Sequence, residues 1–90
     1  MLRPVAPHSE SVLEEAARIV NGDRAADYGD AQASFDRIAA LWAPILGVPV
    51  TAKHVALCLI QLKVSRACTS DKRDNWVDLA GYAQLGSMLK

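Results

Sequence analysis

The chain has 90 residues, of which ten are basic and ten acidic, and 51% of its residues are hydrophobic. This composition favours one packed domain over disorder, and the neutral charge argues against nucleic acid, because no excess of positive charge meets the phosphates. We expect a single helical domain over 1–90, whose first ten residues, 1–10, form an extended N-terminal tail. A domain this small has a thin core, so we expect a homo-oligomer.

No segment approaches the roughly 20 apolar residues that a membrane helix needs, and the first residues lack the apolar run of a signal peptide. We therefore expect a protein without membrane contact in the cytoplasm of a bacterial host. Cys58 and Cys68 lie about 15 Å apart along one predicted helix, too far for a disulfide, so we expect two buried, reduced thiols. Cys58 shares a helical face with His54, but two ligands are too few for a structural zinc site.

Capping signals and apolar spacing predict the first two helices. Ser11 and Glu14 have the capping-box spacing, and we expect the helix that they begin to end at Asn21-Gly22. Asp30 is the predicted N-cap of the second helix, and Pro44 is expected to end or kink it. The predicted buried positions are Leu13, Ala16, Ala17 and Val20 in the first helix, and Phe35, Ile38, Ala39 and Trp42 in the second.

The third predicted helix, over 52–67, begins at the N-cap Thr51 and is apolar on nearly every side. Such a helix is central to a bundle or lies in an oligomer interface. Asp71 is the predicted N-cap of the last helix, and no strand-like alternation occurs. The expected fold is all-α, a four-helix arrangement with a central apolar third helix, completed by oligomerisation. The predicted buried stripe of the last helix is Trp76, Leu79, Ala80 and Ala83.

The connector at 22–30 is longer and more polar than an ordinary helical hairpin needs. It holds acidic residues, an arginine, a tyrosine and two glycines, and long polar loops on small scaffolds often carry function. Asp27 and Tyr28 are therefore candidate ligand-binding residues. The alternative is a solvated loop in which Asp30 only caps the next helix.

Three acidic residues are candidate ligands for Mg²⁺. Asp74 and Asp78 are four residues apart, so their carboxylates lie on one helical face, where an acid from a facing helix completes an oxygen-ligand site. Glu15 supplies such an acid, because Glu14 is used by the capping box. The alternative assigns Asp74 to the helix dipole, which leaves Asp78 unexplained.

Lys63 and Arg66 are cations three residues apart in the apolar third helix, where each needs a partner or a path to solvent. Two arrangements remain open. They pair with Asp74 and Asp78 on the next helix, or they bind a phosphate-bearing ligand. Neither a P-loop nor a Gly-x-Gly-x-x-Gly motif accompanies them.

Four segments of the chain form a recognisable series: ADYGD at 26–30, FDRIAALW at 35–42, LKVSR at 62–66 and DNWVDLAGY at 74–82. Together they resemble a family of small all-helical proteins of unknown function found in phages and prophages. The resemblance runs over 12–89. The Asp-Tyr-Gly loop followed by an Asp-x-x-x-Asp helix also resembles a group of phage proteins associated with nucleotide modification. More distantly, the arrangement is similar to the MazG-like all-α nucleoside triphosphate pyrophosphohydrolases.

MazG-like enzymes bind Mg²⁺ through a Glu-Glu-x-x-Glu helix and a later Glu-x-x-Asp helix. Here Glu14-Glu15 lacks the third glutamate, and Asp74 and Asp78 have a different spacing. The resemblance implies Mg²⁺ at these aspartates with Glu15 or Asp27, and a base contact from Tyr28.

These features leave three functions open. The first is a phage-type accessory protein that binds nucleotides or hydrolyses them in a metal-dependent, pyrophosphohydrolase-like reaction. The second is a non-catalytic module that sequesters a nucleotide, a signalling molecule or a host or phage partner. The third is a purely structural helical oligomer. The sequence does not decide whether the protein is an enzyme.

Overall fold

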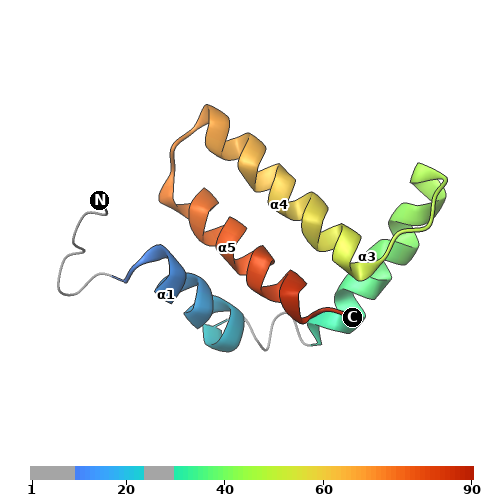
Figure 1. Ribbon diagram of the computed structural model, residues 1–90, viewed down its shortest axis with the longest axis horizontal. Helices are drawn as coiled ribbons and strands as arrows, with labels where there is room; N and C mark the ends of the chain where they lie inside the picture. The colour runs from blue at the N-terminus through green and yellow to red at the C-terminus, as the bar shows by residue number, and fades with distance from the viewer. Residues whose placement is uncertain (1–9, 24–29) are drawn as a thin grey trace.

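The computed structural model describes residues 10–23 and 30–90 (Figure 1). Within these ranges the chain forms four α-helices and one short π-helix, without strands, which confirms the all-α prediction. The elements are α1 (Val12–Arg18), the π-helix η1 (Ile19–Asp23), α3 (Ala31–Leu46), α4 (Ala52–Thr69) and α5 (Arg73–Met88).

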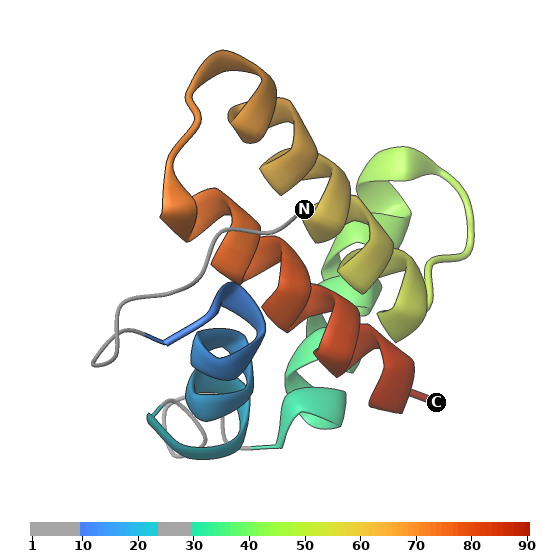
Figure 2. The same ribbon diagram turned by 60° about the vertical axis from the view of Figure 1, so that its left-hand side comes forward.

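Helices α1, α5 and α4 lie side by side, with α5 in the middle, and α3 crosses one end of this layer (Figures 1 and 2). The first half of α3 packs against the start of α4 and the end of α5, whereas its last turns diverge from α4 (Figure 1). Helix α4 contacts both α3 and α5, but most of its residues are exposed, so α5 rather than the predicted third helix is central to the layer. The core where the three helices meet consists of Phe35, Ala39, Ala52, Val55, Ala56, Leu85 and Leu89.

The predicted start of the first helix is confirmed, and its helical segment ends at Asp23, one residue after the predicted Asn21-Gly22, without the expected left-handed glycine. The backbone N–H of Glu14 donates to Ser11 Oγ at 3.1 Å, and the N–H of Ser11 donates to Glu14 Oε1 at 3.1 Å. The chain does not turn at Gly22 but continues helically as η1 to Asp23. Ile19 and Val20 contact α5 there, so tertiary packing carries the helix past its glycine.

Helix α3 begins as predicted and ends later than predicted. Asp30 Oδ1 accepts the backbone N–H of Gln32 at 3.0 Å, which confirms the N-cap. Pro44 lies inside the helix, which closes at Gly47 with a φ of 72°. A proline so near the C-terminus removes only one helical hydrogen bond, and the left-handed glycine then supplies the stop.

Thr51 caps α4 as predicted, and His54 completes the cap. The His54 N–H donates to Thr51 Oγ1 at 3.2 Å, and the Thr51 N–H donates to His54 Nδ1 at 3.0 Å. This histidine is thus an N-terminal capping residue.

The start of α5 corrects the prediction for Asp71. Lys72 occupies the N-cap position without a side-chain hydrogen bond, and Asp71 instead accepts the indole N–H of Trp76 at 3.1 Å. Asn75 is buried and donates to the carbonyl oxygen of Ser70 at 3.0 Å. The turn before α5 is therefore held by the side chains of Asn75 and Trp76, which follow it, and not by an N-cap side chain.

The buried side of α5 also differs from the prediction. Trp76 is 49% exposed, whereas Asn75, Val77, Gly81 and Leu85 are buried. Both cysteines are exposed free thiols, contrary to the expected burial. The cause is the same in both helices: α4 and α5 are apolar on several sides, but few neighbouring helices cover them.

A single chain leaves many apolar side chains in contact with solvent, and its self-association stays a prediction. Within the described ranges, no helix combines the length and apolarity that crossing a membrane requires. The large hydrophobic residues that remain exposed are Leu13, Leu41, Ile45, Leu46, Val48, Leu57, Leu62, Val64, Trp76 and Met88.

Candidate functional site

Four of the charged residues selected from the sequence lie on the last turns of α4 and the first turns of α5. The two helices are joined by the short turn after Thr69, so the last turns of α4 lie beside the first turns of α5 (Figure 1). Lys63 Nζ lies 2.8 Å from Asp78 Oδ2, so for these two residues the structure shows the ion pair, one of the two arrangements that the sequence left open. We call Lys63, Arg66, Asp74 and Asp78 the α4–α5 charge cluster.

The other two members of the cluster are not paired in the same way. Arg66 and Asp74 are both exposed, and neither side chain forms a hydrogen bond or an ion pair with any other described residue. The predicted network is therefore only half formed. A guanidinium and a carboxylate remain available to a ligand beside the completed Lys63–Asp78 pair.

Glu15 belongs to a separate set of interactions that joins α1 to α5. Its carboxylate pairs with the guanidinium of Arg73, which also donates to the carbonyl oxygen of Glu10 at 2.6 Å. The Glu10 carboxylate accepts hydrogen bonds from Arg18 at 2.9 Å, and this bond lowers the pKa of Glu10 below its usual value. Glu15 is thus engaged by a cation.

The predicted metal ligands do not form a cluster of three acids. Within residues 10–23 and 30–90, no group of three or more His, Cys, Asp and Glu side chains is arranged to hold a metal ion. The Mg²⁺ assignment to Asp74, Asp78 and Glu15 stays a prediction. Asp27 and Tyr28, the predicted ligand contacts, lie outside the described residues.

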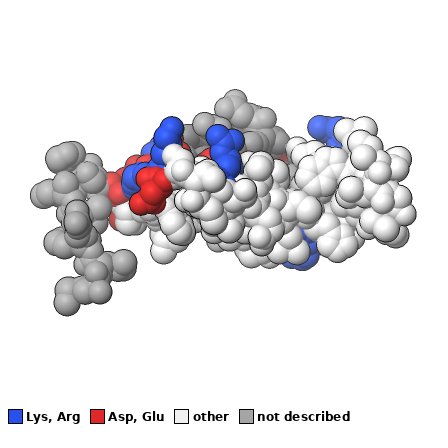
Figure 3. All heavy atoms as spheres, turned by 90° about the horizontal axis from the view of Figure 1, so that it is seen from above, with Lys and Arg blue, Asp and Glu red and all other residues white. Residues whose placement is uncertain are grey.

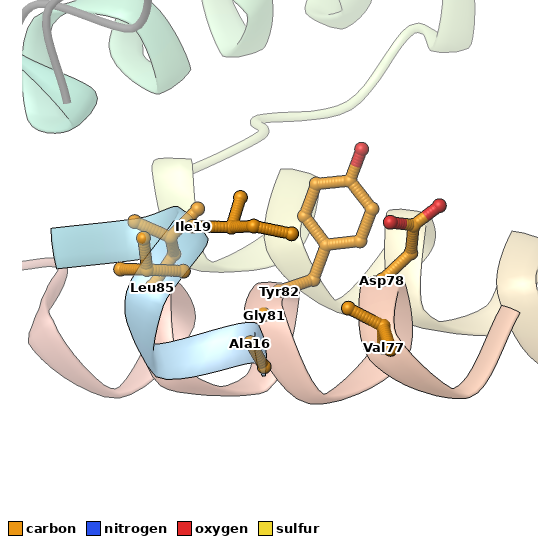
Figure 4. A pocket seen from close by; sticks show the side chains of 8 residues that line it. Ala16, Ile19, Val77, Asp78, Gly81, Tyr82 and Leu85 are labelled. Carbon is orange, nitrogen blue, oxygen red and sulfur yellow. The ribbon is translucent and has the colours of Figure 1, made fainter. Parts of the chain in front are cut away.

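A small cavity lies between α1, η1 and α5, next to the charge cluster (Figure 4). Its volume of about 30 Å³ is that of a single water molecule, so a nucleotide does not fit inside it. Asp78 and Tyr82 rise from the same side of α5, with their polar ends beside each other (Figure 4). This cavity is therefore too small to be a nucleotide-binding pocket.

Tyr82 is a residue of this site that the sequence prediction missed. It lies one helical turn after Asp78, and this spacing is the signal that could have indicated it.

Comparison with known proteins identifies the family of the chain. A family model described as "Domain of unknown function (DUF6378)" matches residues 11–90. The chain belongs to the DUF6378 family. This confirms the expected membership of a family of unknown function, while the resemblance to MazG-like enzymes stays a prediction.

Two mycobacteriophage proteins are similar to this DUF6378 chain. It is 45% identical over 75 residues to the Gene 55 protein of Mycobacterium phage L5, covering 81% of this chain and 48% of that protein. It is 40% identical over 76 residues to the Gene 55 protein of Mycobacterium phage D29, covering 83% of this chain and 50% of that one. The chain thus spans about half the length of these relatives. No solved structure matches it.

Proposed function

We propose that the protein binds the phosphate groups of a nucleotide together with Mg²⁺ at the α4–α5 charge cluster. The observation that supports this most strongly is the pair of exposed side chains, Arg66 and Asp74, without partners among the described residues. One is a ligand for phosphate and the other is a ligand for a metal ion. Beside them, Lys63 is a second cation for phosphate and Asp78 is a second carboxylate for the metal ion.

The two cations have complementary roles in this proposal. Arg66 offers a planar fork of N–H donors that matches phosphate oxygens, and Lys63 offers a compact charge. Lys63 is held by Asp78 in the free protein. Binding of Mg²⁺ to Asp78 competes with that ion pair and frees Lys63 for a phosphate oxygen. Ligand binding thus replaces the Lys63–Asp78 ion pair with contacts from Lys63 to phosphate and from Asp78 to Mg²⁺.

The acids suit a magnesium ion that arrives with its nucleotide. Mg²⁺ is commonly held by one or two carboxylates, with phosphate oxygens and water as the remaining ligands. Asp74 and Asp78 supply two carboxylates one helical turn apart, so a third acid is not required. When bound, the ion neutralises and orients the phosphates. Glu15 remains with Arg73 in this arrangement, and Asp27 and Tyr28 remain proposed contacts to the nucleotide.

A second candidate function is non-catalytic interaction with a host or phage protein. It is supported by the many exposed large hydrophobic side chains, which are typical of interaction surfaces. The phage relatives support a role inside an infected bacterium, and we propose the host cytoplasm as its location. Cleavage of the phosphate chain, as in a pyrophosphohydrolase, is a further step that the binding proposal does not require.

Calorimetric titration with ATP and dATP in the presence of Mg²⁺ tests the proposal. We expect saturable binding that Arg66→Gln weakens at least tenfold and that Asp74→Asn makes independent of Mg²⁺. Arg37→Gln is the matched control, because Arg37 is an exposed arginine on α3, outside the cluster. Equal affinities for the Arg66 and Arg37 variants contradict the site, and the absence of binding by the unmodified protein contradicts the function.

A further inference from the structure

Helix α1 and the π-helix η1 lie at the edge of the packed core; we call residues 12–23 the α1–η1 segment. The main core cluster draws its residues from α3, α4 and the C-terminal end of α5, and contains none from α1. Val20 is only partly buried against that cluster. Ala16 is the only buried residue between Val12 and Gly22, and Leu13 is 73% exposed. Because apolar burial provides most of the energy that docks a helix, this segment is weakly docked.

The two glycines of α5 show how differently its neighbours pack against it. A Cβ at Gly86 would lie 3.1 Å from Ala56 Cβ on α4. The nearest contact of a Cβ at Gly81 outside its own helix would be Val20 Cγ2 on η1, at 3.6 Å. The cavity of about 30 Å³ also lies on this side, between the segment and Val77 and Gly81 of α5 (Figure 4). Atoms that border a void lose dispersion contacts, so the segment is held against α5 less tightly than α4 is.

Charged groups provide a second part of the attachment. The guanidinium of Arg73 on α5 pairs with the Glu15 carboxylate and donates to the carbonyl oxygen of Glu10 at 2.6 Å. On the side of the molecule seen in Figure 3, acidic and basic side chains gather towards the end that carries α1 and the start of α5. The Arg73 side chain is 45% exposed, so water screens its ion pair and the contribution of that pair to stability is small.

We propose that the α1–η1 segment is a movable cover, which leaves α5 as a unit while α3, α4 and α5 stay packed together. Proteins open locally where few apolar contacts hold a segment, at a lower free energy than global unfolding requires. Opening exposes Val77 and Gly81, which are buried in the closed form, and removes one wall of the cavity beside Asp78. The ion pair of Arg73 with Glu15 favours the closed form. The open form thus presents an apolar strip of α5 next to the α4–α5 charge cluster, and this inference is independent of nucleotide binding.

Hydrogen exchange of the full chain, measured by mass spectrometry of peptides, tests the cover. We expect the amides of residues 16–22 to exchange about a hundredfold faster than those of residues 55–64 in α4, but more slowly than in an unfolded chain. Arg73→Gln should accelerate exchange in 16–22 about threefold, because it removes a screened ion pair, and leave 55–64 unchanged. Arg37→Gln is the matched control, because Arg37 is an exposed arginine on α3 without an ion pair to any described residue. It should change neither rate.

Three outcomes overturn the proposal. Equal protection of the α1–η1 segment and of α4 shows that the whole molecule opens in one step, without a separate cover. Exchange of the segment at the rate of an unfolded chain shows that it is not docked on α5 in solution. Exchange that Arg73→Gln leaves unchanged, or that Arg37→Gln accelerates equally, shows that the ion pair of Arg73 with Glu15 does not hold the cover closed.

A thiol placed under the cover gives a second test. Val77→Cys introduces one at the cavity wall that the segment covers, and Ala39→Cys introduces one at a comparably buried position of the core cluster on α3. We expect a maleimide to modify the thiol of Val77→Cys about tenfold faster than that of Ala39→Cys, because local opening reaches only the former. Mass spectrometry of peptides separates both thiols from the exposed Cys58 and Cys68. Equal rates in the two variants, once circular dichroism shows that both are folded, would contradict the cover.

Discussion

Lys63 Nζ and Asp78 Oδ2 lie 2.8 Å apart and join the second half of α4 to the first half of α5. The lysine side chain is 16% exposed and the aspartate side chain 43%, so the pair is at the boundary between protein and solvent. The lysine stem is buried between the helices while its ammonium group reaches an acid at the surface. The pair holds α4 against α5, and both of its residues also belong to the proposed binding site.

The first prediction concerns the energy of this ion pair. In a double-mutant cycle of Lys63→Met and Asp78→Asn, we expect a coupling of about 0.5–1 kcal/mol in the free energy of unfolding, because the pair is partly screened by water. Urea denaturation of the four proteins measures it. A coupling of zero would show that the two side chains do not interact in solution.

The second prediction compares the two glycines in α5. A Cβ at Gly81 has Val20 Cγ2 at 3.6 Å, an ordinary contact, so Gly81→Ala should raise stability by up to about 1 kcal/mol. A Cβ at Gly86 lies only 3.1 Å from Ala56 Cβ on α4, so overpacking should cancel the gain in Gly86→Ala. Thermal unfolding of both variants checks the difference. Equal stabilisation by both would mean that α4 and α5 do not pack closely at Gly86.

The third prediction concerns Asn75, the buried polar residue at the start of α5. Its side chain donates to the Ser70 carbonyl oxygen at 3.0 Å, so Asn75→Ala should cost about 1–2 kcal/mol through the lost hydrogen bond. Gln61→Ala on the exposed side of α4 is the control and should change stability little. Chemical denaturation gives both values, and a neutral Asn75→Ala would contradict the assigned role in the turn.

The fourth prediction is a pH effect at Glu10. The hydrogen bond from Arg18 holds the pKa of this carboxyl below its usual value of 4.5. Because the folded state lowers the pKa, the interaction stabilises the protein fully above pH 4.5 and is lost as the pH falls through the lowered value. Carboxyl carbon NMR should show the Glu10 titration move towards higher pH in Arg18→Gln. An unchanged midpoint would exclude the interaction.

Local sequence signals predicted the helix starts well. Ser11 with Glu14, Asp30, and Thr51 all cap as expected, because a cap depends on residues within one turn. Features that depend on distant partners were not predictable in this way. The helical segment ends at Asp23 rather than at Gly22, in a part of the chain that packs on α5, and Trp76 is exposed because none of the other described helices covers it.

The residue pairings of the candidate site were likewise predicted only in part. Lys63 and Asp78 could be paired from sequence, because two isolated charges on neighbouring apolar helices need each other. The pairing of Glu15 with Arg73 was not predicted, because it requires α1 to lie against the start of α5. Asp71 was misassigned as a cap, because its acceptance of the Trp76 indole N–H has no short-range signature.

The most direct test of the central claim is phosphorus NMR of ATP and dATP with the purified protein, with and without Mg²⁺. The account predicts that the phosphate signals shift or broaden in the presence of the protein and Mg²⁺, and that Arg66→Gln removes the effect while Arg37→Gln preserves it. New product signals would add hydrolysis to binding. Spectra unchanged by the unmodified protein, at protein concentrations equal to those of the nucleotide, would contradict nucleotide binding at the α4–α5 charge cluster.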